Sequence, residues 1–130
     1  ISQRIASDDS VRRISSERFR ADAPVGSRVG LANHKGKKLC RAGLALDSED
    51  TIVAAVMAGD MHVAPPDTLD RVALALVGAR AHDTDGLRTR ITAVWDDPNV
   101  HQADATMGVT TDDLLTAVTK AATAAQGAGT

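Results

Sequence analysis

The residue types best suited to chemistry in this chain are three lysines gathered around one glycine. Lys35, Gly36, Lys37 and Lys38 follow one another and form its densest cluster of positive charge, with Arg41 close by. Ammonium groups attract phosphate, and a glycine lets the backbone approach an anion closely. The cluster therefore predicts a site for a phosphate-bearing ligand. The alternative is a solvated basic turn that binds nothing.

A second candidate site follows at Gly59, Asp60 and His62. Aspartate bonds readily to backbone amides two or three residues further on, so Asp60 is suited to orient a partner loop or to cap the next segment. The alternative is a plain turn, and we expect no catalytic residue because no second carboxylate is spaced to share acid–base work. The four histidines are widely separated and have no supporting cysteines, so we expect no metal site. His62 is the histidine that we would test.

Cys40 is the single cysteine of the chain. Its neighbours Lys38 and Arg41 favour the thiolate that a sulfur carrier needs, because nearby cations lower the pKa of a thiol. Its alternation with Leu44 and Leu46 predicts instead an inward, inert thiol. One cysteine allows no internal disulfide and fits a reducing compartment. The sequence has neither a run of about 20 apolar residues nor a signal peptide, so we expect a cytoplasmic protein with no membrane partner.

Length and charge narrow the possible functions. At 130 residues the chain fits one domain, and its start at Ile1 suggests a piece of something longer. Residues 1–41 hold ten of the 15 Lys and Arg but only four of the 17 Asp and Glu. A basic start facing an acidic remainder predicts internal complementarity or a positive edge for an anionic partner. Phe19 is the only aromatic residue among the early arginines, so we expect no nucleic-acid partner.

Two strands must position the lysine cluster. Apolar residues recur at every second position from Leu39 to Leu46, and the pattern returns from Ile52 to Ala58. The polar turn at residues 47–50 has hairpin length, so the strands should run antiparallel. Residues 27–32 are β-compatible, and residues 1–26 are predicted to form a helical arm or linker. The expected inward residues are Cys40, Ala42, Leu44, Leu46, Ile52, Val53, Val56 and Met57.

Two amphipathic helices are predicted after the strands. Residues 65–67, Pro-Pro-Asp, open the first helix, and Gly78 should end it. The second should run from Asp85 to Trp95, before a break at residues 96–99. The expected inward residues are Leu69, Val72, Ala73, Leu76 and Val77 in the first helix and Leu87, Ile91, Val94 and Trp95 in the second.

A third helix should begin at Thr110, which forms a capping-box pattern with Asp113. It should bury Leu114, Leu115, Val118, Ala121 and Ala122 and fray after Ala125. The predicted fold class is α+β, a small antiparallel β-meander covered on one face by three helices, with an N-terminal helical arm. We expect the arm or linker at 1–26, the domain at 27–126 and a disordered tail at 127–130.

The order of these pieces resembles the C-terminal accessory domain of lipoate–protein ligases of the two-part type. The resemblance covers about residues 30–120. It is carried by Lys35, Gly36-Lys37-Lys38-Leu39, the turn from Asp47 to Asp50, Gly59-Asp60, Pro65-Pro66, Leu76-Val77-Gly78 and Gly108-Val109-Thr110. This chain departs from the family pattern at the turn, where one glycine replaces two, and at Met61-His62, where the family has aromatic residues.

The resemblance implies a domain of small sheet and helices, similar to sulfur-transfer scaffold folds. Such a domain docks beside a large catalytic domain, on the same or a separate chain, which holds lipoate, ATP and Mg. It assists formation of lipoyl-adenylate before transfer to a lysine of a lipoyl carrier protein, which is therefore an indirect partner. The residues expected to contact ligand or partner are Lys35, Gly36, Lys37, Lys38, Gly59, Asp60 and His62.

The same resemblance implies that this chain has no cofactor of its own and is not catalytic alone. Nothing in it resembles the arginine- and glycine-rich loop or the catalytic lysine strand of the ligase's large domain. Two alternatives stay open on the sequence. One is a small sulfur-transfer or scaffold protein that uses Cys40, and the other is a non-catalytic binding module.

Overall fold

The computed structural model describes residues 19, 23–36, 38–59, 63–102 and 108–127. Most of the predicted N-terminal arm lies outside the described residues. Three of the predicted contact residues, Lys37, Asp60 and His62, also lie outside them.

Three strands form an antiparallel sheet in the order β1 (Arg28–Lys35), β2 (Leu39–Leu46), β3 (Ile52–Gly59). This confirms the predicted meander. The first strand is longer than the β-compatible stretch at 27–32. His34 and Lys35, expected in a basic turn, instead pair with Cys40 and Leu39, because the ladder between β1 and β2 continues to the end of β1 at Lys35.

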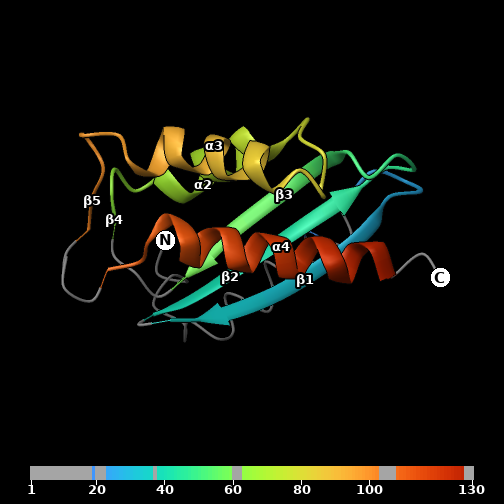
Figure 1. The fold of residues 1–130 in the computed structure, drawn as a ribbon, viewed down its shortest axis with the longest axis horizontal. Helices are drawn as coiled ribbons and strands as arrows, with labels where there is room; N and C mark the ends of the chain where they lie inside the picture. Colours follow the sequence, from blue (N-terminus) through green and yellow to red (C-terminus); the bar gives the residue numbers. More distant parts are fainter. Residues whose placement is uncertain (1–18, 20–22, 37, 60–62, 103–107, 128–130) are drawn as a thin grey trace, which may run out of the picture.

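The described residues form three helices, α2 (Thr68–Leu76), α3 (Thr84–Trp95) and α4 (Thr111–Gly127). Figure 1 shows α4 lying over β1 and β2 and α2 beside β3, and α3 packs against α2 and α4. Buried side chains of all three pack in one cluster with Cys40, Ala42, Leu44 and Leu46 of β2. The helices therefore cover one face of the sheet, as the sequence predicted. Within the described ranges, each helix is too short or too polar to cross a membrane.

A two-residue pair, β4 (Val63–Ala64) with β5 (His101–Gln102), forms a second small antiparallel sheet. The sequence did not predict it, because two residues show no periodicity. β5 precedes α4, and the Gln102 side chain bonds to both backbone groups of Val109, with Nε2 donating to the carbonyl at 2.9 Å and Oε1 accepting from the amide at 2.7 Å.

The core residues of β3 differ from the prediction. Ile52 and Met57 are buried although they are five positions apart, whereas Val53 and Val56 are half-buried. The reason is an irregularity in the β2–β3 register, where Leu46 pairs with Ile52 but Ala45 pairs with Ala54. One extra residue on β3 reverses the alternation, as a β-bulge does.

The predicted helix ends are largely confirmed. The Thr110 amide donates to Asp113 Oδ2 at 3.0 Å and the Asp113 amide to Thr110 Oγ1 at 3.2 Å, which is a complete capping box at the start of α4. Gly78 has φ of 95° just after α2. Val77, expected inward, is 40% exposed because the chain is already extended there. α4 runs to Gly127, past the expected fraying point, because Ala125 is fully buried.

β1 and α4 approach each other unusually closely at Gly30. A side chain at this position would collide with the backbone of Ala121 and Ala125. The next residues of β1 on the same face are Ala32, which packs against the core, and His34, which contacts Asp113. Alternate residues of β1 therefore face α4, and those between them face away.

Candidate functional site

The lysine cluster lies at one end of the sheet, where β1 turns into β2; we call this the turn end. Lys35 closes β1 and is exposed, Gly36 is exposed in the turn, and Lys38 is half-buried. Lys35 and Leu39 are the last pair of the ladder. Three of the four predicted turn residues are therefore described, and they lie together at a solvent-facing bend.

The second candidate is brought to the same end. Gly59 closes β3 and pairs with Cys40, which pairs in turn with His34. The sheet thus places Gly59 at the same end as the lysine turn, although Gly59 follows Lys35 by 24 positions in the sequence. Asp60 and His62, which follow directly, stay outside the described residues.

Asp113, at the start of α4, holds the turn from the helix side of the sheet. His34 Nε2 lies 3.2 Å from Asp113 Oδ1, and both side chains are less than a quarter exposed. A Cβ added at Gly36 would lie 2.7 Å from the same oxygen, so glycine is the residue that lets the turn come this close. Both sequence neighbours of Lys35 therefore contact one carboxylate.

Asp113 is held in its charged form. Burial acts to raise the pKa of this carboxyl group, but hydrogen bonds from Thr110 and His34 act against it, and the pKa lies below its usual range. The Asp113 carboxylate therefore stays negatively charged next to a turn that carries positive charge. This arrangement fixes the backbone of the turn and leaves the Lys35 ammonium in solvent.

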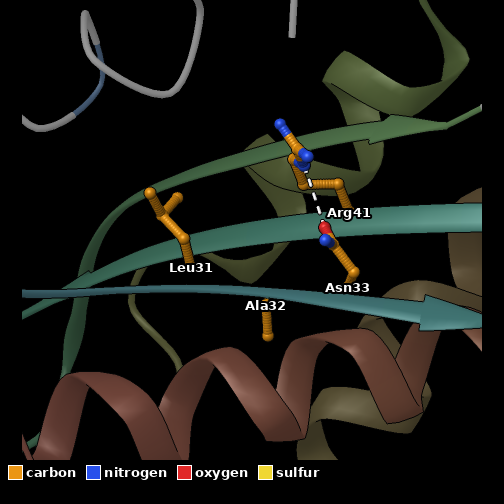
Figure 2. Close-up of a pocket in the computed structure, with 4 residues that line it drawn as sticks. All are labelled: Leu31, Ala32, Asn33 and Arg41. Atoms are coloured by element: carbon orange, nitrogen blue, oxygen red, sulfur yellow. Dashed lines mark hydrogen bonds between the residues drawn. The ribbon is translucent and has the colours of Figure 1, made fainter. Parts of the chain in front are cut away.

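The face of the sheet opposite the helices, which we call the open face, carries the polar groups beside the turn. By alternation it bears Lys35, Asn33 and Leu31 of β1 and Arg41 of β2. Arg41 Nε donates to Asn33 Oδ1 at 2.9 Å, and Figure 2 shows these two side chains pointing toward each other while Ala32 points to α4. The positive groups at Lys35 and Arg41 therefore share one face.

A shallow hollow of about 230 Å³ is lined by Leu31, Ala32, Asn33 and Arg41 (Figure 2). It joins an apolar wall to a guanidinium and an amide, a combination that suits an anionic group with an apolar flank. Sequence reasoning missed Asn33. The signal was available, since Asn33 precedes Lys35 by two positions and faces Arg41 once β1 is extended to Lys35.

Cys40 is fully buried on the helix side of β2. Burial, and secondly the charge of Asp113, raise the pKa of its thiol to about 11. The predicted inward position of the thiol is confirmed. The expectation that Lys38 and Arg41 lower the thiol pKa is wrong, because Arg41 lies on the opposite face of β2 and the charge that acts on the thiol is that of Asp113.

In the part of the chain that the structure describes, the charged side chains do not gather as metal ligands. Among the described residues, no group of three or more His, Cys, Asp or Glu side chains lies close enough together to hold a metal ion. What the turn end offers is a cluster of donors and cations on a fixed backbone. Such a site can bind an anion or an acidic partner surface.

No protein-family model matches the sequence, and neither does any curated protein. Among solved structures, the chain is similar to one from a study of an archaeal lipoylation system, a bipartite lipoate protein ligase and its E2 lipoyl domain, from Thermoplasma acidophilum. The TM-score is 0.58 and the identity 24%, over 71% of this chain and 96% of that one. The two chains therefore share a fold over nearly the whole length of the archaeal one.

Proposed function

We propose that this chain is the accessory domain or subunit of a lipoate–protein ligase. In this role it assists ATP-dependent formation of lipoyl-adenylate by a separate catalytic domain, before the lipoyl group passes to a lysine of a carrier protein. The observation that carries the proposal is that the fold similarity and the placement of the motifs agree. The fold is similar to a chain from a bipartite ligase system, and two of the motifs that resemble the ligase accessory domain, the Lys35 turn and Gly59, meet at one end of the sheet.

The charge at the turn end supports this role. An acyl-adenylate carries a phosphate, and Lys35 and Arg41 present positive charge on one face beside Gly36, where the backbone has no side chain. Because His34 and Asp113 fix the backbone of the turn, the lysine side chain is the part left to reach an anion. In this proposal the turn closes over the adenylate made in the partner domain.

The state of Cys40 bears on the sulfur-transfer alternative. A sulfur carrier needs an accessible thiolate, whereas this thiol is buried and has a raised pKa. The observation counts against that alternative. A plain binding module remains an outcome of the test below, because it would bind the partner without changing the rate of adenylate formation.

The test is lipoyl-adenylate formation by the catalytic domain with and without this chain, followed by lipoyl transfer to a lipoyl domain. We expect the chain to raise the rate of adenylate formation. Lys35→Glu should reduce that effect by about tenfold, the loss of one charge-assisted contact. Lys120→Glu is the matched control, since Lys120 is exposed on α4 and makes the same change in net charge away from the turn.

Equal rates of adenylate formation with and without the chain would contradict the proposal. If the chain binds the catalytic domain but leaves the rate unchanged, the binding module is the better description. If Lys35→Glu and Lys120→Glu reduce the rate equally, the effect is one of net charge, and the turn has no specific part in it.

A further inference from the structure

The two long edges of the sheet differ in what covers them. In the part of the chain that the structure describes, β2 is the only strand that pairs with β1, so β1 is an edge strand. On the other edge, Ile52 of β3 accepts from the Gly78 amide and donates to the Ala79 carbonyl, both at 2.8 Å, which covers the start of β3. An edge strand presents backbone groups with which a further extended segment can pair.

The hairpin between β2 and β3 determines which residues of β1 present such groups. The Asp47 amide donates to the Thr51 carbonyl at 3.0 Å, and the Asp47 carbonyl accepts from the Asp50 amide at 3.1 Å, so both groups face β3. Successive residues of an antiparallel strand direct their backbone groups to opposite edges, so Leu46 directs its own toward β1. Its partner Arg28 faces β2 in the same way. By alternation, the residues of β1 that direct backbone groups outward are Val29, Leu31, Asn33 and Lys35.

The side chains of the same four residues lie on the open face. Asn33 and Lys35 are exposed near the turn end, whereas Val29 and Leu31 are half-buried toward the hairpin end. A segment added to this edge would therefore meet polar and positively charged groups at one end and apolar groups at the other.

Arg41 fixes the orientation of the Asn33 amide. Arg41 Nε donates to Asn33 Oδ1 at 2.9 Å, and Figure 2 shows the arginine coming from the neighbouring strand. Because the oxygen faces Arg41, the Nδ2 group with its two N–H donors faces away from that contact. The hollow of about 230 Å³ lies beside these groups and is also lined by Leu31 and Ala32. This arrangement offers both space and donors to an acidic side chain next to β1.

We propose that the outer edge of β1 is a docking site for an extended, acidic segment of a partner protein. The segment adds to the three-stranded sheet as a further strand. Main-chain hydrogen bonds to the outward residues of β1 give affinity, and side chains at alternate positions give specificity. Acidic side chains lie opposite Asn33 and Lys35, and apolar ones lie opposite Val29 and Leu31.

Charge favours this occupant over a second copy of the chain. β1 contains Arg28 and Lys35 and no acidic residue, so two copies of β1 would bring positive charge to both strands of the pair. Lysine on an edge strand is also one of the features that discourage pairing between identical strands. An acidic segment turns the same charge into an attraction.

The docking site does not depend on the proposed function, and its test needs no ligase. The probe is a short capped peptide with glutamate at the first two of its alternate positions and valine at the next two, separated by threonines. Antiparallel to β1, it places the glutamates opposite Lys35 and Asn33. We expect the full chain to bind it, measured by fluorescence anisotropy, and to bind about tenfold more weakly a peptide in which lysine replaces both glutamates.

A charge reversal on the protein should reverse this preference. Lys35→Glu should bind the lysine peptide better than the glutamate peptide. Lys120→Glu is the matched control, because it makes the same change in net charge on α4 and should keep the original preference. Trp95 fluorescence verifies folding, since its indole is buried among the helices and donates to the Val109 carbonyl at 2.9 Å.

Two N-methylated peptides test the backbone pairing. Opposite residues of such an antiparallel pair exchange their hydrogen bonds, so the glutamates and valines direct their N–H groups toward β1. Methyl groups on these nitrogens should abolish binding. Methyl groups on the threonine nitrogens point to the free edge of the peptide and should leave binding intact.

Amide hydrogen exchange, followed by NMR for each residue, tests the edge itself. In the free chain, the Gly30 and Ala32 amides face β2 and should exchange slowly, whereas those of Leu31 and Asn33 should exchange fast. The glutamate peptide, at about ten times its Kd, should slow exchange at Leu31 and Asn33 by about tenfold.

Slow exchange at Leu31 and Asn33 in the free chain overturns the proposal, because the edge is then already paired. If that protection rises with protein concentration, the occupant is a second copy. Failure of the glutamate peptide to bind, equal binding of the lysine peptide, or binding that survives methylation of the glutamate and valine nitrogens also overturns it. Binding that follows the expected charge and methylation pattern, with new protection at Leu31 and Asn33, supports it.

Discussion

The two ends of the sheet are each tied by an ion pair that involves β1, but the two pairs differ in kind. At the hairpin end, where β2 turns into β3, Arg28 is paired with Asp50 and also donates to the Asp47 carbonyl at 2.6 Å. At the turn end, the pair is His34 with Asp113. α4 reaches both ends, since Asp113 lies in its first turn and Gln126 in its last lies 3.5 Å from Asp50.

The two pairs differ in the residue type that carries the positive charge. An arginine is charged at every physiological pH, whereas a histidine is charged only when it holds a second proton. An arginine supplies the positive partner at the hairpin end, and a histidine is the partner of Asp113 at the end that carries the candidate site.

The largest effect should follow from breaking the turn end. Asp113→Ala removes the capping box of α4 and leaves His34 without its partner, so we expect a loss of about 2 kcal/mol in the free energy of unfolding. Urea denaturation followed by Trp95 fluorescence measures it. Asp112→Ala, an exposed aspartate in the same helical turn, serves as control and should lose much less.

A smaller effect is expected at the hairpin end. Asp50 is paired with Arg28 and has φ of 62°, a region that favours glycine. Asp50→Ala loses the pair and keeps the unfavourable backbone, so it should cost about 1 kcal/mol. Asp50→Gly loses the same pair but relieves the backbone, and should cost less. Equal losses in the two variants, again by urea denaturation, would argue that the backbone at Asp50 is not strained.

The turn end should lose stability in acid. The pKa of Asp113 is lowered in the folded state, so its contribution to stability is present above the unfolded pKa of about 3.9 and is lost as the pH falls through the folded value. Asp113→Asn should therefore flatten the acid side of the stability curve. A curve of unchanged shape in this variant would contradict the assignment of the titration to Asp113.

The smallest expected signal is the reaction of Cys40 with a thiol reagent. In the native chain at pH 8 the thiol is buried and protonated, since burial and Asp113 raise its pKa to about 11, so labelling should proceed only through opening of the structure. Asp113→Ala should speed the labelling more than Asp50→Ala does, because Cys40 lies at the turn end. Fast labelling of the unmodified chain would instead revive a sulfur-handling role.

The sequence predicted those parts of the fold that local patterns encode. The alternation from Leu39 to Leu46 and the Thr110–Asp113 capping box depend on residues a few positions apart, and both are confirmed. The bulge that separates Ile52 from Met57 escaped prediction, because it arises from pairing with β2 and leaves the composition of β3 unchanged.

The candidate site was predicted less completely than the fold. The lysine turn can be recognised in the sequence as a run of positive charge. The contact between His34 and Asp113 that holds the turn cannot, because these residues are 79 positions apart and meet only when α4 packs on β1. The Asn33–Arg41 contact required knowing that the ladder reaches Lys35. Side chains that act together through tertiary packing leave no local signature.

The close contact between Gly30 and α4 fixes which residues of β1 face the helix. If β1 slipped by one residue, Val29 or Leu31 would have to occupy a gap too narrow for a methyl group, and each side chain of the strand would change face. The missing side chain at position 30 thereby decides that His34 meets the helix and that Lys35 and Asn33 point the other way. The chemistry offered at the far end of the strand is set by the smallest residue near its beginning.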